Sequence, residues 1–143
     1  MHDNFANVTL ATTLENVGLA RIIVAGFISP LNPSVGEISD IKTAVSEAIT
    51  NAIIHGYDGE SGTVEMRLLC QGRKITIEIC DNGIGIENID IVREPLFTTK
   101  PDMERSGLGF TVMENFMDSV EIASTFGEGT TIILTKTLAD QIA

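Results

Sequence analysis

The sequence predicts an α+β fold, a two-layer α/β sandwich in which helices cover one face of a mixed β-sheet. The chain has 143 residues and 43% of them are hydrophobic, so residues 1–143 are expected to form a single domain with one core. Apolar residues recur with the period of a strand in some segments and with the period of a helix in others. These segments are mixed along the chain without the strict alternation that is typical of a parallel sheet.

The first part of the chain contains one predicted strand and two predicted helices. Asn7–Thr12 has the apolar alternation of a short strand, and Leu14–Ile28 carries the apolar stripe of an amphipathic helix. Two prolines follow and end that helix. Ser34 and Glu37 have the spacing of a capping box, so a second helix is expected to begin there, to run to about Ile54 and to end near Gly56.

The second part contains two predicted hairpins with a third helix between them. Thr63–Cys70 and Lys74–Asp81 are expected to pair as antiparallel strands around a glycine turn. Gly107–Met117 is the predicted third helix. Ser119–Thr125 and Thr130–Lys136 are the strands of the second hairpin, joined by the turn FGEG.

The net charge of −11 limits the classes of partner. A nucleic acid attracts basic surfaces, so direct binding of nucleic acid is not expected. The charge is compatible with a basic protein partner or with solubility alone. Cys70 and Cys80 lack the spacing of a metal site and are expected to be buried free thiols in a reducing cytoplasm. No signal peptide and no apolar run long enough for a membrane helix are visible.

Glu47 and Asn51 lie four residues apart on the second predicted helix, so their side chains share one face. A carboxylate beside an amide oxygen can hold a proton and a hard cation such as Mg²⁺, which prefers oxygen ligands. The alternative is a solvated polar helix face without a function.

Two glycine-rich motifs flank the segment between the third strand and the third helix. DNGIGI begins at Asp81, where a carboxylate at a strand end can accept a hydrogen bond from an amino group. ERSGLGF ends in the predicted start of the third helix, and free N–H groups at a helix start can bind phosphate. An ordinary turn and an ordinary glycine-rich helix start explain the same residues. Thr130 follows the second hairpin turn, where it could complete a polar base pocket or only begin a strand.

Motifs of several other enzyme classes are absent from the sequence. There is no GxxxxGK[ST] loop, no protein-kinase HRD and DFG pair, no GxSxG elbow and no GxGxxG fingerprint. A P-loop enzyme, an ordinary protein kinase and a dinucleotide-binding domain are therefore not expected.

Taken together and in this order, the motifs resemble the ATP-binding fold shared by gyrase, Hsp90, histidine kinases and MutL. EAITNAIIHGY, PLFTTKP and ERSGLGFTVMENFMD are most similar to the bacterial anti-sigma factor serine kinases, on the sporulation branch. The resemblance covers the chain from about Val8 to Thr137. It implies the GHKL, or Bergerat, ATP-binding fold with ATP and Mg²⁺ as cofactors.

The resemblance also implies roles for the positions that match the family's motifs. Glu47 would be the general base, and Asn51 would be a ligand of Mg²⁺. Asp81 would bind the amino group of adenine, with Thr130 nearby. Arg21 would contact a partner protein.

The same resemblance assigns the glycine-rich motifs to the nucleotide, with Glu87–Ser106 as a lid over it. The residues expected to shape the cradle or to approach the phosphates are Gly83, Gly85, Thr98, Thr99, Lys100, Arg105, Ser106, Gly107 and Gly109.

The activity implied by the resemblance is that of an anti-sigma factor with protein serine kinase activity. Such a protein binds and inhibits a sporulation sigma factor of the sigma F type, and it phosphorylates a serine of its anti-anti-sigma antagonist. It acts as a homodimer. Two alternatives remain open: a related kinase for a stress-response sigma factor, and a nucleotide-gated binding module without phosphoryl transfer. His55 has no candidate phospho-acceptor region around it, so an autophosphorylating histidine kinase is not expected.

Overall fold

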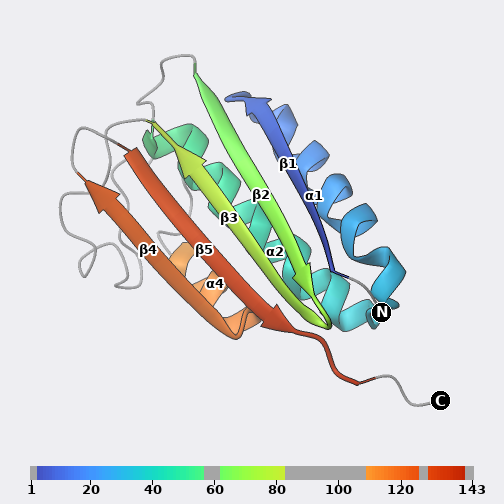
Figure 1. Cartoon of the computed structure of the whole chain (residues 1–143). Helices are drawn as coiled ribbons and strands as arrows, with labels where there is room; N and C mark the ends of the chain where they lie inside the picture. The colour runs from blue at the N-terminus through green and yellow to red at the C-terminus, as the bar shows by residue number, and fades with distance from the viewer. Residues whose placement is uncertain (1–2, 57–61, 83–108, 126–128, 141–143) are drawn as a thin grey trace.

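The computed structural model describes residues 3–56, 62–82, 109–125 and 129–140 (Figure 1). The helical segments are α1 (Glu15–Ile28), the short 3₁₀ helix η1 (Ser29–Leu31), α2 (Val35–Asn51), the π-helical turn η2 (Ala52–Gly56) and α4 (Gly109–Phe116). The strands are β1 (Asn4–Ala11), β2 (Thr63–Gln71), β3 (Lys74–Asp81), β4 (Ser119–Thr125) and β5 (Gly129–Thr137).

The five strands form one sheet in the order β1-β2-β3-β5-β4, and each of the four neighbouring pairs is antiparallel. The predicted two-layer α+β class is confirmed, because the helices lie together on one face of the sheet (Figure 1). The predicted mixed sheet is wrong for the described strands. The helices α1 and α2 lie between β1 and β2 in sequence. They return the chain to the edge of the sheet where β1 ends, so β2 starts beside Ala11 and runs antiparallel to β1. In the described part of the chain α4 lies between β3 and β4 in sequence, and in the sheet β5 lies between those two strands and is antiparallel to both.

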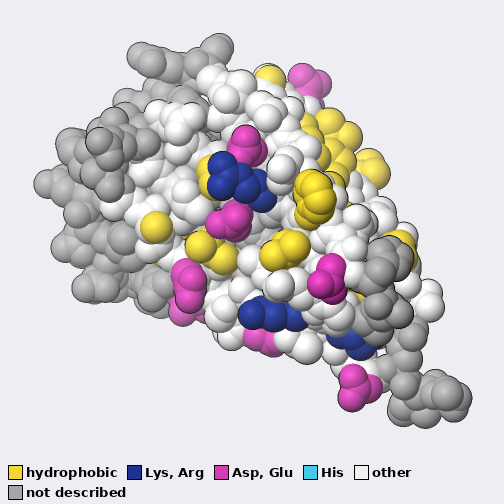
Figure 2. Space-filling view, in the orientation of Figure 1, with side chains coloured by type: hydrophobic (Ala, Val, Ile, Leu, Met, Phe, Trp, Pro, Cys, Tyr) yellow, Lys and Arg dark blue, Asp and Glu magenta, His cyan; other side chains and the backbone are white. Residues whose placement is uncertain are grey.

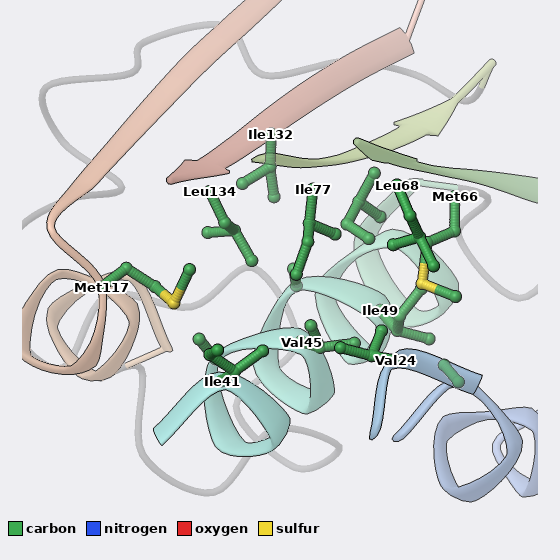
Figure 3. Packing of buried hydrophobic residues seen from close by; sticks show 14 of the residues in the cluster. Val24, Ile41, Val45, Ile49, Met66, Leu68, Ile77, Met117, Ile132 and Leu134 are labelled. Carbon is green, nitrogen blue, oxygen red and sulfur yellow. The ribbon is translucent and has the colours of Figure 1, made fainter. Parts of the chain in front are cut away.

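The strands alternate between a buried face and an open face. Every second residue of β3 is buried, from Ile75 to Asp81, as expected for a strand with one covered face. In Figure 3, side chains of the sheet point toward the helices, and side chains of the helices point back toward the sheet. The labelled side chains of this core are Val24, Ile41, Val45, Ile49, Met66, Leu68, Ile77, Met117, Ile132 and Leu134.

The start of α2 has the predicted capping box. The Glu37 N–H donates to Ser34 Oγ over 3.1 Å, and the Ser34 N–H donates to Glu37 Oε1 over 2.9 Å. These reciprocal bonds satisfy two N–H groups that the first helical turn leaves without intrahelical partners. The helical run extends to Gly56 as predicted, but its final turn, from Ala52 onward, is a π turn.

Other predicted elements agree with the structure apart from their ends. The first strand begins at Asn4 instead of Asn7, and α1 begins at Glu15. Both hairpins are present, and Gly72 in the first turn has a φ of 61°, a conformation that glycine adopts without strain. Residues 107–108, the predicted start of the third helix, lie outside the described residues.

The two cysteines are both free, but only one is buried as predicted. Cys70 lies on the helix-covered face of β2, and burial raises the pKa of its thiol. Cys80 is half-buried because the alternation of β3 places it on the open face, so its predicted burial is wrong.

The open face of the sheet carries acidic, basic and apolar side chains side by side (Figure 2). Arg67 pairs there with Glu65, its neighbour on the same face of β2. In the described part of the chain, no helix combines the length and the apolar character needed to cross a lipid bilayer.

Candidate nucleotide-binding site

Three polar residues interrupt the apolar interior of the described chain. Asn51, Asp81 and Thr130 are 9%, 8% and 7% exposed, and they are the buried polar or charged residues among those that the structure describes. Burial of a polar group is unfavourable unless a hydrogen bond compensates it. The sequence predicts all three at the nucleotide site: Asn51 as a ligand of Mg²⁺, Asp81 as the contact of the adenine amino group, and Thr130 near Asp81.

Asp81 and Thr130 are brought together by the pairing of β3 with β5. Asp81 is the last residue of β3 and Thr130 is the second of β5, and the two are direct cross-strand partners. Both side chains occupy buried positions in the alternation of their strands, so they face the helical layer. The sheet therefore places a carboxyl group beside a hydroxyl group at one end of the core.

Gly129 permits this pairing because its backbone lies directly against that of β3. A Cβ atom at Gly129 would lie 2.1 Å from the Asp81 carbonyl oxygen and 2.8 Å from the Asn82 Cα atom. Its φ of 110° is also a conformation that side chains with a Cβ rarely adopt. Glycine is therefore required at the position that precedes Thr130.

A serine that the sequence analysis did not single out completes this corner of the site. Ser124 on β4 is the cross-strand partner of Thr130, and their hydroxyl oxygens are 3.0 Å apart. The Ser124 hydroxyl also donates to the Gly129 carbonyl oxygen over 3.1 Å. Symmetric pairing around the turn FGEG would set Thr125 opposite Thr130. In the structure Gly129 pairs with Thr125, and this shift of one residue places Ser124 opposite Thr130, so the sequence pattern did not reveal Ser124.

The end of α2 supplies the polar groups from the helical layer. Asn51 is its last residue, and η2, which follows, contacts both β3 and β5 (Figure 1). The buried Nδ2 atom of Asn51 has no hydrogen-bond partner among the described residues. Glu47, one turn earlier on α2, is half-buried. A π turn next to a polar residue is a feature often found at functional sites.

The remaining predicted residues lie on other elements or outside the described part of the chain. Gly109 is the first residue of α4, at the helix start where a phosphate was predicted. Arg21 is exposed on α1, which contacts β1 and β2. The residues that lie outside the described part of the chain are Gly83, Gly85, Thr98, Thr99, Lys100, Arg105, Ser106 and Gly107, together with the predicted lid.

A cavity of about 140 Å³ lies on the other side of the sheet and is not part of the candidate site. Glu65, Arg67 and Cys80 line it from the open face. Asp81, by contrast, faces the helical layer.

Comparison with known proteins agrees with the arrangement of these elements. Residues 10–136 match the family described as the histidine kinase-like ATPase domain. In solved structures, the RsbU and RsbW domains of a Mycobacterium tuberculosis protein superpose with a TM-score of 0.68 at 20% identity. That match covers 94% of this chain and 32% of the other chain, and it shows a shared fold.

Proteins named anti-sigma F factor are similar over almost their whole length. The one from Clostridium kluyveri is 48% identical over 136 residues, which are 95% of this chain and 96% of that protein. The one from Clostridium acetobutylicum is 50% identical over 139 residues, 97% of each chain. The one from Bacillus thuringiensis is 50% identical over 141 residues, 98% of this chain and 97% of that protein. The chain therefore belongs to the histidine kinase-like ATPase domain family and, within it, to the family of the anti-sigma F factors.

Proposed function

We propose that the protein is a cytoplasmic anti-sigma factor with ATP-dependent protein serine kinase activity. It binds and inhibits a sigma factor of the sigma F type, and it phosphorylates a serine of the anti-anti-sigma protein that opposes it. The proposal rests on the family and on one structural observation. Two buried polar residues from distant strands, Asp81 and Thr130, pair directly in an otherwise apolar core, and a third, Asn51, precedes the turn η2, which contacts both strands.

The adenine base is proposed to bind at the corner formed by Asp81 and Thr130. The Asp81 carboxylate is a hydrogen-bond acceptor that would pair with the amino group of adenine. Both residues are more than nine-tenths buried, so a base bound there is shielded from competing water. The phosphates are proposed to approach the N-terminal end of α4 near Gly109, because a helix N-terminus favours anions through its N–H groups and its dipole.

Asn51 suits a position beside the phosphates. Its buried Nδ2 atom lacks a partner among the described residues, and a phosphate oxygen would supply the missing acceptor. Its amide oxygen would hold Mg²⁺, which proteins usually bind through one or two side chains together with phosphates. When bound, Mg²⁺ supplies positive charge that offsets the charge of the phosphates.

Glu47 is proposed as the general base. It is half-buried, and it lies one helical turn from Asn51 on the same face of α2. From there its carboxylate would accept the proton of the attacking serine hydroxyl and orient that hydroxyl toward the terminal phosphate. Positioning and electrostatic stabilisation would supply most of the rate enhancement. The roles of Lys100 and Arg105 near the phosphates remain predictions from the sequence.

The partner surface is proposed to include Arg21, which is exposed on α1. The net charge of −11 favours a partner with a basic surface. A homodimer is proposed because the resemblance implies one.

A phosphoryl-transfer assay tests this function. The full chain, Mg²⁺ and γ-labelled ATP are mixed with the candidate anti-anti-sigma protein, and label on a partner serine is measured. Glu47→Gln should lower the transfer rate by at least about a hundredfold, because a general base contributes a factor of this order. ATP affinity should change little, since Gln keeps the size of the side chain and Glu47 is proposed to contact the attacking serine and not the nucleotide.

The matched control is Glu121→Gln, which removes the same charge from an exposed position on β4. It should transfer at the wild-type rate. Transfer by Glu47→Gln at the wild-type rate would refute the base assignment. ATP binding without any transfer by the wild-type protein would leave a nucleotide-gated binding module, with sigma-factor capture as the activity to measure next.

A further inference from the structure

We propose that Ser124 is a positioning residue that fixes the Thr130 hydroxyl as a hydrogen-bond acceptor and thereby sets the preference for adenine over 6-oxopurines. This inference rests on the proposed binding of ATP at Asp81 and Thr130. It extends that proposal to a residue that does not itself contact the base.

The geometry of the hydroxyl groups determines where their protons lie. Ser124 Oγ is 3.1 Å from the Gly129 carbonyl oxygen and 3.0 Å from Thr130 Oγ1. The carbonyl has no proton, so the single proton of Ser124 is used in the first bond. The bond between the two hydroxyl groups must then use the proton of the Thr130 hydroxyl. That proton therefore points toward Ser124 Oγ.

The consequence is that Thr130 presents lone pairs to the rest of the site. A hydroxyl group has one proton and two acceptor lone pairs, and this proton is already engaged. The neighbouring Asp81 is also an acceptor when it is ionised. The corner between β3 and β5 therefore presents two adjacent acceptors within a buried environment.

Two adjacent acceptors distinguish purines by the group at position 6. Adenine carries an amino group there, with two N–H donors. Hypoxanthine and guanine carry a carbonyl oxygen beside an N–H at position 1, so one acceptor of the site would face another acceptor. A buried acceptor without a donor is costly, and sites built on such pairing reject analogues that lack the donor.

The test is to compare the affinities for ATP and ITP by calorimetry with Mg²⁺ present. ITP differs from ATP at the 6-position and at the adjoining N1 proton. The wild-type protein should bind ATP roughly a hundredfold more tightly than ITP, since both acceptors contribute to the discrimination. In Ser124→Ala the Thr130 proton is released and can turn to donate to the 6-oxygen. The ATP-to-ITP ratio should then fall about tenfold, through tighter binding of ITP.

Three further variants separate this role from a purely structural one. Ser124→Thr keeps the hydroxyl group in a strand-favouring residue and should retain the wild-type ratio. Ser119→Ala makes the same truncation at an exposed position of β4 and should also retain it. In a Thr130→Val background, Ser124→Ala should have no further effect on the ratio, because the hydroxyl that it orients is gone.

The outcomes separate this inference from the proposed function. If the wild-type protein binds neither nucleotide, both are overturned. If it binds ATP and ITP equally, or if Ser124→Ala weakens both nucleotides by the same factor, this inference falls and ATP binding stands. A selective gain of ITP affinity in Ser124→Ala, absent from Ser124→Thr, supports it.

Discussion

Gly129 illustrates at the residue scale how the absence of a side chain builds the site. The strand β5 begins so close to the end of β3 that a Cβ atom would overlap the backbone of Asp81. The overlapping atoms belong to the backbone, so no side-chain rotation can relieve the contact. The position of Asp81 opposite Thr130 therefore depends on a residue that has no side chain.

Gly129→Ala should lower the free energy of unfolding by about 1–3 kcal/mol and weaken ATP binding at least tenfold. The first effect follows from the strained φ and the second from displacement of Asp81. Chemical denaturation and calorimetry measure the two quantities. Gly18→Ala is the control: it lies within α1 with open space around it, and it should stabilise the protein by up to about 1 kcal/mol. Wild-type stability and affinity in Gly129→Ala would mean that the close approach has no role.

At the element scale, α2 connects the cap at its start with the polar residues at its end. The Glu37 carboxylate accepts from the N–H groups of Ser34 and Ala139, at 2.9 and 2.8 Å. It therefore caps the helix and also ties the chain after β5 to it. The hydrogen bond from the Ser34 N–H, and to a smaller extent that from the Ala139 N–H, keeps the pKa of Glu37 below its ordinary value of 4.5.

The lowered pKa predicts a pH dependence of stability. The ionised form of Glu37 is favoured in the folded state, so its contribution is complete above pH 4.5 and is lost as the pH falls through the folded-state pKa. Glu37→Gln should therefore destabilise the protein at pH 7 by less than about 1 kcal/mol, because solvent screens this carboxylate. Urea unfolding at pH 7 and at pH 3 measures the difference between variant and wild type. A difference that stays constant or grows at pH 3 would contradict this account.

The elements were predictable from the sequence to the extent that local interactions determine them. The start of α2 was predicted because a capping box needs only Ser34 and Glu37. The π turn after Asn51 was not predicted, because residues 52–56 continue an ordinary apolar helical pattern. The half-exposure of Cys80 was missed for another reason: its neighbours are apolar, and only the alternation of β3 shows which face it occupies.

At the scale of the whole molecule, the site joins segments that are distant in the sequence. Asn51, Asp81 and Thr130 were identified individually from the sequence, but the pairing of β3 with β5 brings the last two together. That pairing depends on the path of the chain around α4, which local patterns do not encode. The same dependence explains why the sheet was expected to be mixed and is antiparallel throughout its described strands.

The measurement that tests the central claim most directly is calorimetric titration of ATP with Mg²⁺ into the wild-type protein and Asp81→Asn. ATP is an anion, so removing a negative charge should by itself strengthen its binding slightly. Asp140→Asn, at an exposed position after β5, measures that general effect. The account predicts that Asp81→Asn binds ATP at least about tenfold more weakly than the wild type while Asp140→Asn does not. Equal or tighter binding by Asp81→Asn would show that the adenine does not bind at the buried corner between β3 and β5.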